Sequence, residues 1–428
     1  MSPARYPPGH RETTASAEAA AARVHKRVDA AAVRANLAVL RAASGGRHVM
    51  AVVKGDAYGL GAPALSGVLA EAGVEALAVD TVAEGVELRE HGVRLPVLVM
   101  DVDVPGTEEV CAGHGLMPSV SSREQVERHA LAAVRGGTPC AVWLRANVGF
   151  NRFGPREEQG FADVVSALDR QRHVLRAEGV FAHLSSSADD PEETAEQSVL
   201  YRARLEHARR VLGAGLRSSL AATHGLAHPL ALEGTAWVRP GIGLYGLTQP
   251  RARELPGWAA SGLGRLRPAV SVRARVMELR EVTRAEGLGY DRRARVPHGR
   301  VLASVAVGFA RGLAPAAGAF TGVLRGRGCP MVGRPGMDCA QFDVTEVPGA
   351  APGDWMTLLG PAAPEDGGGE RAAPAVCAEL GRTVYALLPG FRAPVRLHHT
   401  AQEKDLTGTA APGPARTPAH TPDQGGSP

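Results

Sequence analysis

The chain has 428 residues, enough for two domains or for one barrel with an appendage. Its apolar content of 44% suits a soluble globular protein, and no apolar run reaches the ~20 residues that cross a bilayer. The N-terminus also lacks the apolar centre of a secretory signal. We therefore expect a cytoplasmic protein with no membrane partner.

The charged and sulfur-bearing residues argue against two further classes of function. A net charge of +4 is small for this length and the arginines are spread out, so we expect no nucleic-acid partner. The five cysteines are scattered without metal-ligand spacing, which predicts reduced core thiols and no metal site. Both ends are rich in small residues and proline, and we expect residues 1–23 and 399–428 to be disordered tails.

Short apolar runs alternate with segments of helical spacing from Val28 to about Tyr245. Eight runs predict strands, near residues 50, 78, 98, 118, 143, 181, 221 and 238. Eight alternations in roughly 220 residues fit a closed parallel (β/α)8 barrel of the TIM type, which we place at residues 24–264. An open doubly wound sheet is the alternative, although no GxGxxG motif opens the first helix.

The pattern of apolar and turn-forming residues changes at about residue 265. Apolar segments such as SVRARVMELREV, RVLASVAVGF and DWMTLLG are separated by Gly and Pro turns. This pattern predicts a small all-β domain over residues 265–398. Within it, the stretch AAPEDGGGERAAP near residue 368 predicts an exposed loop.

Lysine is rare in this chain. Lys26, Lys54 and Lys404 are the only three, against dozens of arginines. An arginine is always protonated, whereas a lysine can lose its proton and form a Schiff base. Lys54 directly follows the first predicted barrel strand, so it is the candidate nucleophile, with a solvated surface lysine as the alternative.

Polar residues follow several other predicted strands. Arg145, His183, His224 and Arg239 lie at or beyond strand ends, and in such a barrel these ends surround the active site. The glycines that follow Arg239 leave backbone N–H groups open to an anion, and barrel phosphate sites commonly follow the last two strands. An ordinary Gly/Pro turn is the alternative for that segment.

Five motifs extend this pattern into a family resemblance that runs from about residue 24 to 398. In order along the chain they are AVVKGDAYGLG (51–61), NVGFNRFG (147–154), VRPGIGLYG (238–246), GRPGMD (333–338) and FRAPVR (391–396). They resemble those of the alanine racemase family of fold-type III pyridoxal-phosphate enzymes. The resemblance implies a cofactor, pyridoxal 5'-phosphate, and an amino-acid substrate that undergoes racemisation at Cα.

The resemblance also implies roles for residues of the barrel. Lys54 would hold the cofactor through a Schiff base and act as one proton-transfer base. Tyr58 would contact the cofactor phosphate, Arg152 would bind the substrate carboxylate, and His183 would support the cofactor. Arg239 would face the pyridine nitrogen and keep it unprotonated, which disfavours transamination.

Other implied roles involve a loop of the barrel and the second domain. Gly241 and Ile242 would give backbone N–H groups to the phosphate. Tyr290 would be the second base, and Met337 would offer its backbone amide to the substrate carboxylate. In the family the last two act on the partner subunit's cofactor, which implies a homodimer with shared active sites.

Four positions depart from the family pattern. Phe309 and Phe391 stand where family members usually have tyrosines that guard the entrance and reach the phosphate. We therefore expect a more apolar pocket, and a substrate that is an amino acid other than alanine or one with a larger apolar side chain. Arg145 replaces a lysine that is often modified, and His224 replaces a phosphate-binding serine while adding bulk and possible positive charge. Two alternatives to an amino-acid racemase follow: a paralogue with other pyridoxal-phosphate chemistry in specialised metabolism, and a non-catalytic cofactor-binding protein.

Overall fold

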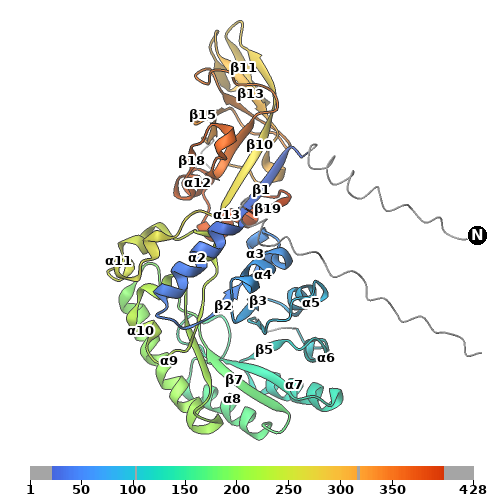
Figure 1. Ribbon diagram of the computed structural model, residues 1–428, viewed down its shortest axis with the longest axis vertical. Helices are drawn as coiled ribbons and strands as arrows, with labels where there is room; N and C mark the ends of the chain where they lie inside the picture. Colours follow the sequence, from blue (N-terminus) through green and yellow to red (C-terminus); the bar gives the residue numbers. More distant parts are fainter. Residues whose placement is uncertain (1–21, 102–103, 316–318, 400–428) are drawn as a thin grey trace, which may run out of the picture. The chain divides into compact units, whose positions relative to one another are not determined.

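The structure is a computed structural model that describes residues 22–101, 104–315 and 319–399. Most of both predicted tails therefore lies outside the described residues. All eight predicted barrel strands form, and they pair in chain order into one closed parallel barrel (Figure 1). They are β2 (His48–Val52), β3 (Ala76–Val79), β4 (Val97–Val99), β5 (Met117–Val120), β6 (Cys140–Arg145), β7 (Leu175–Phe181), β8 (Arg217–Ala222) and β9 (Trp237–Arg239).

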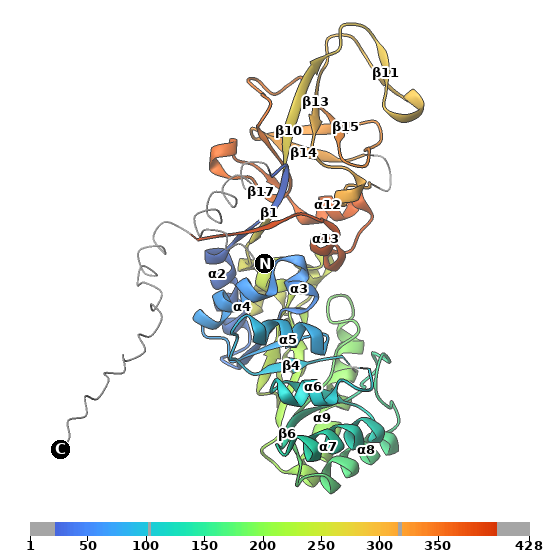
Figure 2. The same ribbon diagram turned by 90° about the vertical axis from the view of Figure 1, so that its right-hand side faces the viewer.

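Helices connect these strands and lie outside the barrel (Figure 2). The helices of this region are α2 (Ala30–Ala43), α3 (Lys54–Gly59), α4 (Ala62–Glu71), α5 (Val82–Glu90), α6 (Glu108–Gly113), α7 (Arg123–Gly136), α8 (Glu158–Arg170), α9 (Pro191–Leu212), α10 (Pro229–Leu232) and α11 (Trp258–Ser261). Two of these helices begin with capping boxes, in which side chains bond the free backbone N–H groups of the first turn. Thr81 and Glu84 form the box at α5, and Ser122 and Gln125 form that at α7. Among the described residues, no helix is both long and apolar enough to cross a bilayer.

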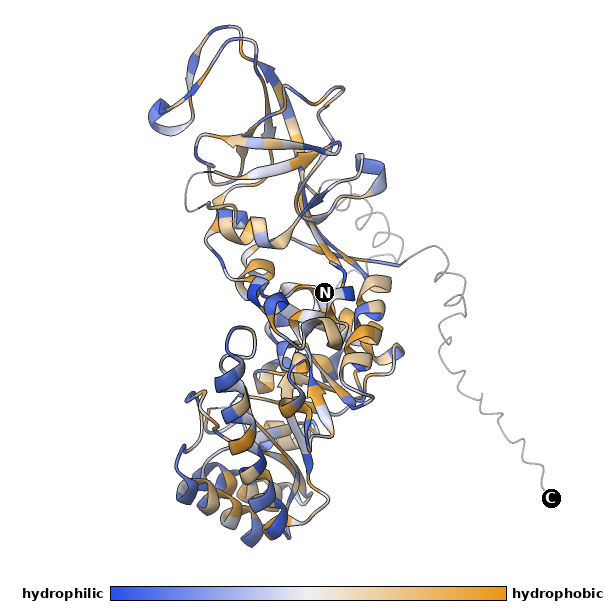
Figure 3. Ribbon diagram, turned by 90° about the vertical axis from the view of Figure 1, so that its left-hand side faces the viewer, coloured by the Kyte–Doolittle hydropathy of each residue, from blue (hydrophilic) through white to orange (hydrophobic). Residues whose placement is uncertain are grey.

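The strand β2 shows how the barrel separates its two cores. Met50 and Val52 point into the barrel, where they join an interior cluster with residues such as Trp143. Val49 and Ala51, at the alternate positions, belong to the larger core that includes the helices. Both faces of a parallel barrel strand are buried, which explains the continuous apolar run in the sequence. In Figure 3 the helices carry both hydrophilic and apolar residues, as expected when one side of a helix faces water.

The remaining strands form a nine-stranded sheet and a two-stranded ribbon. The sheet order is β18 (Glu370–Arg371), β17 (Trp355–Pro361), β14 (Thr321–Leu324), β15 (Arg327–Val332), β16 (Ala340–Asp343), β13 (Val301–Val305), β10 (Val270–Glu281), β1 (Val24–Asp29) and β19 (Val395–His398). An extra pairing of β17 with β10 closes part of this sheet on itself, and the ribbon pairs β11 (Glu286–Leu288) with β12 (Ala294–Val296).

One expectation for this part of the chain needs correction. The segment of β1, placed with the barrel from its sequence, pairs instead with β10 and β19 of the C-terminal sheet. The predicted β domain after residue 265 forms, and it also contains two short helices, α12 (Ala373–Leu380) and α13 (Val384–Gly390). The stretch near residue 368 is largely exposed, as predicted, although the side chain of Asp366 pairs with Arg273 and both side chains are less than 10% exposed.

Short 3-10 turns complete the structure. They are η1 (His224–Ala227), η2 (Ile242–Tyr245), η3 (Pro250–Glu254), η4 (Leu263–Arg265), η5 (Tyr290–Arg292), η6 (Phe309–Arg311) and η7 (Pro364–Asp366). Two of them, η1 and η2, directly follow the last two barrel strands and place backbone at the barrel mouth.

Candidate active site

A cavity of about 470 Å³ opens at the C-terminal ends of the barrel strands. Eight of the ten site residues expected from the sequence line it: Lys54, Tyr58, Arg152, His183, His224, Arg239, Gly241 and Ile242. The other two, Tyr290 and Met337, do not line it in the single chain. Convergence at this edge follows from the parallel barrel, because every strand ends at the same rim.

Lys54 begins an unusual turn. Gly55, Asp56, Ala57 and Tyr58 all have positive φ, between 53° and 63°, so the α3 segment winds in the left-handed sense. For residues with a Cβ this conformation costs roughly 1–2 kcal/mol each. Strain of this kind persists only where surrounding contacts enforce it, and it concentrates at functional sites.

Hydrogen bonds within the turn and from distant elements hold it. The Gly55 N–H donates to Glu84 Oε1 at 2.6 Å, and the Ala62 N–H donates to Asp56 Oδ1 at 2.6 Å. Lys26 on β1 is 3% exposed, and its Nζ donates to the Gly59 carbonyl at 2.7 Å. The C-terminal sheet thus braces the loop that carries Lys54.

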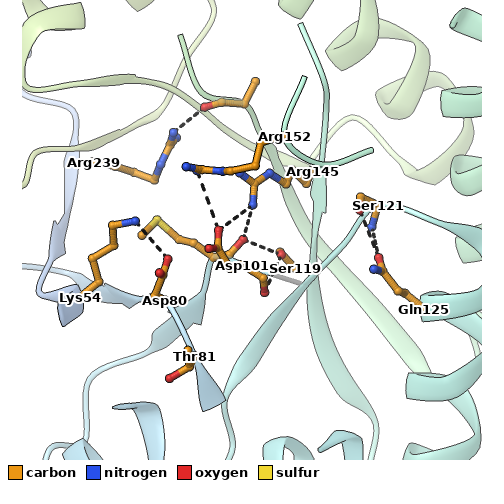
Figure 4. A network of polar contacts seen from close by, with 12 residues as sticks. Lys54, Asp80, Thr81, Asp101, Ser119, Ser121, Gln125, Arg145, Arg152 and Arg239 are labelled. Atoms are coloured by element: carbon orange, nitrogen blue, oxygen red, sulfur yellow. Dashed lines mark hydrogen bonds and ion pairs between the residues drawn. The ribbon is translucent and has the colours of Figure 1, made fainter. Parts of the chain in front are cut away.

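The amine of Lys54 is held by a carboxylate. Its Nζ lies 3.1 Å from Asp80 Oδ1, and both side chains are about one-third exposed to the cavity (Figure 4). Burial raises the pKa of Asp80, and the neighbouring Asp101 adds to this rise although Lys54 opposes it. The lysine is therefore tethered at the cavity by a carboxylate with a raised affinity for protons.

Two arginines share the carboxylate of Asp101 in the same network (Figure 4). Arg145, 5% exposed, lies 3.2 Å from Asp101 Oδ1 and also donates to the Met100 carbonyl at 2.7 Å. Arg152 is 3.9 Å from the same oxygen and stacks over the Phe150 ring at 4.6 Å. Two cations that share one anion leave an excess of positive charge, which suits a carboxylate ligand.

Arg239 lines the cavity and is 2% exposed. It donates to the carbonyl and hydroxyl oxygens of Ser219 at 2.7 and 2.6 Å, and to the Ala182 carbonyl. Burial lowers its pKa to about 10, so it stays charged at neutral pH. Burial, together with Arg239 and other cations, lowers the pKa of His183 to about 3, so that ring is neutral.

The turn after β9 lies close to Tyr58. A Cβ placed on Gly241 would be 2.3 Å from Tyr58 Oη, so no larger residue fits there without displacing the tyrosine. The Gly241 and Gly243 N–H groups both donate to Thr223 Oγ1, at 3.3 and 3.2 Å. Backbone N–H groups and hydroxyls therefore meet at one end of the cavity.

His224 differs from expectation in its charge. Burial lowers its pKa to about 4, so the ring is neutral at neutral pH and does not add the positive charge that we considered. Its Nε2 accepts from the Gln249 N–H at 3.1 Å, and its Nδ1 lies 3.2 Å from Tyr385 Oη.

The two phenylalanines also need correction. Phe391 does not line the cavity: it is 1% exposed and packs in the core, while Tyr385, six residues earlier, lines the cavity. Phe309 is 48% exposed and lies outside the cavity of its own chain. The expectation of a more apolar pocket therefore finds no support in these two side chains within one chain.

The remaining predicted residues gather on the C-terminal part. Tyr290 is 70% and Met337 is 56% exposed. The Phe309 N–H donates to the Gly336 carbonyl at 3.0 Å and the Ala310 N–H to the Met337 carbonyl at 3.1 Å, so Phe309 and Met337 lie side by side. Large apolar side chains exposed in this way suit a surface that another chain covers.

Comparison with known proteins now identifies the family. The model of the alanine racemase N-terminal domain matches residues 28–249, and that of the C-terminal domain matches residues 269–398. The chain belongs to the alanine racemase family. It is 35% identical over 338 residues to the alanine racemase of Geobacter sulfurreducens, a match that covers 78% of this chain and 86% of that protein.

Solved structures in the alanine racemase family agree with this assignment. The alanine racemase from Streptomyces coelicolor A3(2) superposes with a TM-score of 0.79 at 26% identity, covering 89% of this chain and 99% of that one. The alanine racemase from Bartonella henselae, solved with covalently bound pyridoxal phosphate, superposes with a TM-score of 0.75 at 20% identity. That match covers 89% of this chain and 100% of that one. Pyridoxal phosphate is the cofactor of the alanine racemase family.

The lining residues that the sequence analysis did not predict include Asp80, Asp101, Gln249 and Tyr385. Asp80 directly follows β3 and Asp101 closely follows β4, so the rule about strand ends, applied to all eight strands, would have found both. Tyr385 had no such signal, since it comes from α13, outside the barrel.

Proposed function

We propose that this protein is a pyridoxal-phosphate-dependent amino-acid racemase in which Lys54 and Tyr290 are the two bases. The observation that carries the proposal is the convergence of Lys54, Arg152 and Arg239 on one cavity at the barrel mouth. A lysine, a carboxylate-binding cation and a buried cation are the groups that an amino acid and this cofactor require together.

The residues present fit the cofactor. The absence of a side chain at Gly241 lets the Tyr58 hydroxyl approach the backbone that leads into η2, so a phenol and backbone N–H groups lie together, as a phosphate requires. Arg239 is a buried cation with no carboxylate partner among the described residues. When bound, pyridoxal phosphate supplies the electron sink that makes the Cα proton of an amino acid removable.

The chain's own residues would transfer the proton, bind the substrate carboxylate and contact the cofactor ring. Asp80 holds Lys54 Nζ at the cavity. Lys54 Nζ would hold the cofactor and move a proton on one face of Cα. Arg152 would bind the substrate carboxylate, with Asp101 and Arg145 beside it. Arg239 has only donors, so any ring atom facing it must be an acceptor and therefore unprotonated.

If Tyr290 is the second base, it would come from another copy of the chain. Racemisation requires proton transfer on both faces of Cα, and Tyr290 is exposed outside the cavity of its own chain. We therefore propose a homodimer in which Tyr290 and Met337 reach the partner subunit's cavity. Their exposure together with Phe309 supports this arrangement.

Two experiments test these proposals. Incubation with common L-amino acids in D2O should deuterate Cα and yield the D-enantiomer. Deuteration without inversion would indicate other cofactor chemistry, and no exchange would indicate a binding protein. For the dimer, a Lys54→Ala protein mixed with a Tyr290→Phe protein should recover one good site per heterodimer. Mixtures that stay inactive after proven subunit exchange would contradict shared sites.

A further inference from the structure

A second lysine meets the same turn that Lys54 begins. Lys26 lies close to the predicted N-terminal tail, a position typical of a solvated side chain, yet it is only 3% exposed. Its Nζ donates to the Gly59 carbonyl at 2.7 Å. Lys54 therefore begins the left-handed turn, and Lys26 holds the residue at which α3 ends.

Three segments that are distant in the sequence meet at the Lys26 amine. The strand β1 is fixed in the C-terminal sheet, where the Lys26 N–H donates to the Pro394 carbonyl at 2.8 Å. A Cβ built on Gly59 would lie 3.0 Å from Lys26 Nζ and 3.5 Å from the Cα atom of Pro389 in α13. Figures 1 and 2 both place β1 and α13 next to α3. The turn therefore ends against two elements of the C-terminal part, with little room for a side chain at Gly59.

The Lys26 amine is a buried charge. Burial lowers the pKa of Lys26 to about 8 while Asp56 opposes this fall, so the group is still mostly protonated at neutral pH. Taking a charge out of water is unfavourable, and an apolar side chain would fill the same space without that cost. A compact ammonium also fits the narrow space beside Gly59 better than the larger guanidinium of an arginine. The hydrogen bond to the Gly59 carbonyl is the contact that offsets this burial.

The peptide that Lys26 holds directly follows a cavity residue. Gly59 comes after Tyr58, whose hydroxyl lies against Gly241. A shift of the Gly59 peptide would therefore move Tyr58 and the rest of the turn. We propose that Lys26 is a positioning residue for the cofactor: its ammonium group holds the end of the turn, so that Tyr58 and Lys54 face the cavity. The inference rests on the cofactor contacts of these two residues under the proposed function.

Amide hydrogen exchange of the purified full-length protein tests this role whether or not the protein turns over an amino acid. N–H groups of the turn, such as those of Gly55 and Ala62, are hydrogen-bonded, so their exchange reports its opening. Lys26→Met should speed exchange of residues 54–62 about tenfold or more, because the bond to a charged donor is lost, and leave the barrel strands within about twofold. The midpoint of urea unfolding should not fall, since the variant replaces a buried charge by an apolar side chain.

Spectroscopic titration with pyridoxal phosphate gives a second readout. Lys26→Met should weaken cofactor binding about tenfold, and the circular dichroism of the bound cofactor should be smaller at saturation because its orientation is less defined. Exchange that rises equally in all peptides, together with a lower urea midpoint, would show that Lys26 only packs the core and would overturn the proposal. Unchanged exchange in the turn would overturn it as well. Absence of cofactor binding by the natural protein would instead contradict the proposed function itself, and no variant is needed to see it.

Arg27→Met is the matched control. Arg27 is the next residue of β1, and its guanidinium lies 4.0 Å from Glu365 of the C-terminal part, away from the turn. This variant removes a cation from the same strand, but successive side chains of a strand face opposite sides, so exchange of residues 54–62 and cofactor affinity should stay within about twofold of the natural protein. A change as large as that of Lys26→Met would show that any loss of charge from β1 disturbs the turn, which would refute a specific role of Lys26.

Discussion

Removing the hydroxyl of Tyr201 is the sharpest test of how the barrel supports its site. Tyr201 on α9 is fully buried, and its Oη donates to the Val180 carbonyl and accepts from the Ser219 N–H, both at 2.8 Å. These partners belong to the neighbouring strands β7 and β8. Each of the two buried partners left unpaired costs about 1–3 kcal/mol, so Tyr201→Phe should lower the free energy of unfolding by about 2–6 kcal/mol.

Tyr245→Phe provides the control for that experiment. Tyr245 is also fully buried, but its hydroxyl has no hydrogen-bond partner in the described part of the chain. Its removal should be neutral or stabilising, since an unsatisfied buried polar group is lost. Urea unfolding of both variants and the natural protein measures the difference. Equal stabilities of the two variants would refute the reasoning, because the predicted difference depends on the hydrogen-bond partners of each hydroxyl and not on the aromatic ring.

Three other predictions follow from single side chains. Borohydride reduction of the holoenzyme should attach the cofactor to the peptide with Lys54, and label on Lys26 would contradict the assignment. Gly241→Ala should weaken cofactor binding about tenfold (about 1.4 kcal/mol) by displacing Tyr58, measurable by titration. Burial lowers the pKa of His25 from 6.5 to about 4, so the unfolded chain binds this proton first as the pH falls. Stability should therefore drop between about pH 6.5 and 4, and less steeply in His25→Gln; parallel curves would contradict this.

The barrel and most of its rim could be predicted because their signals are local. Each strand is a short apolar run, and closure into a parallel barrel brings all strand ends to one rim, so position along a strand predicts position at the site. Lys54 was further marked by the scarcity of lysine. The same rule was available for Asp80 and Asp101, which followed strands that were correctly predicted.

Contacts between distant segments were decided only by the tertiary structure. His224 and Tyr385 are 161 positions apart, and no local pattern relates a helix of the C-terminal part to a turn of the barrel. The neutral state of His224 could not be predicted either, because burial in the folded chain lowers its pKa. The pairing of β1 with β10 could not be predicted either, because strand propensity shows that a segment is extended but not which strand it pairs with. Residue types and their periodicity therefore determine which elements form, while long-range packing determines which side chains meet in the cavity.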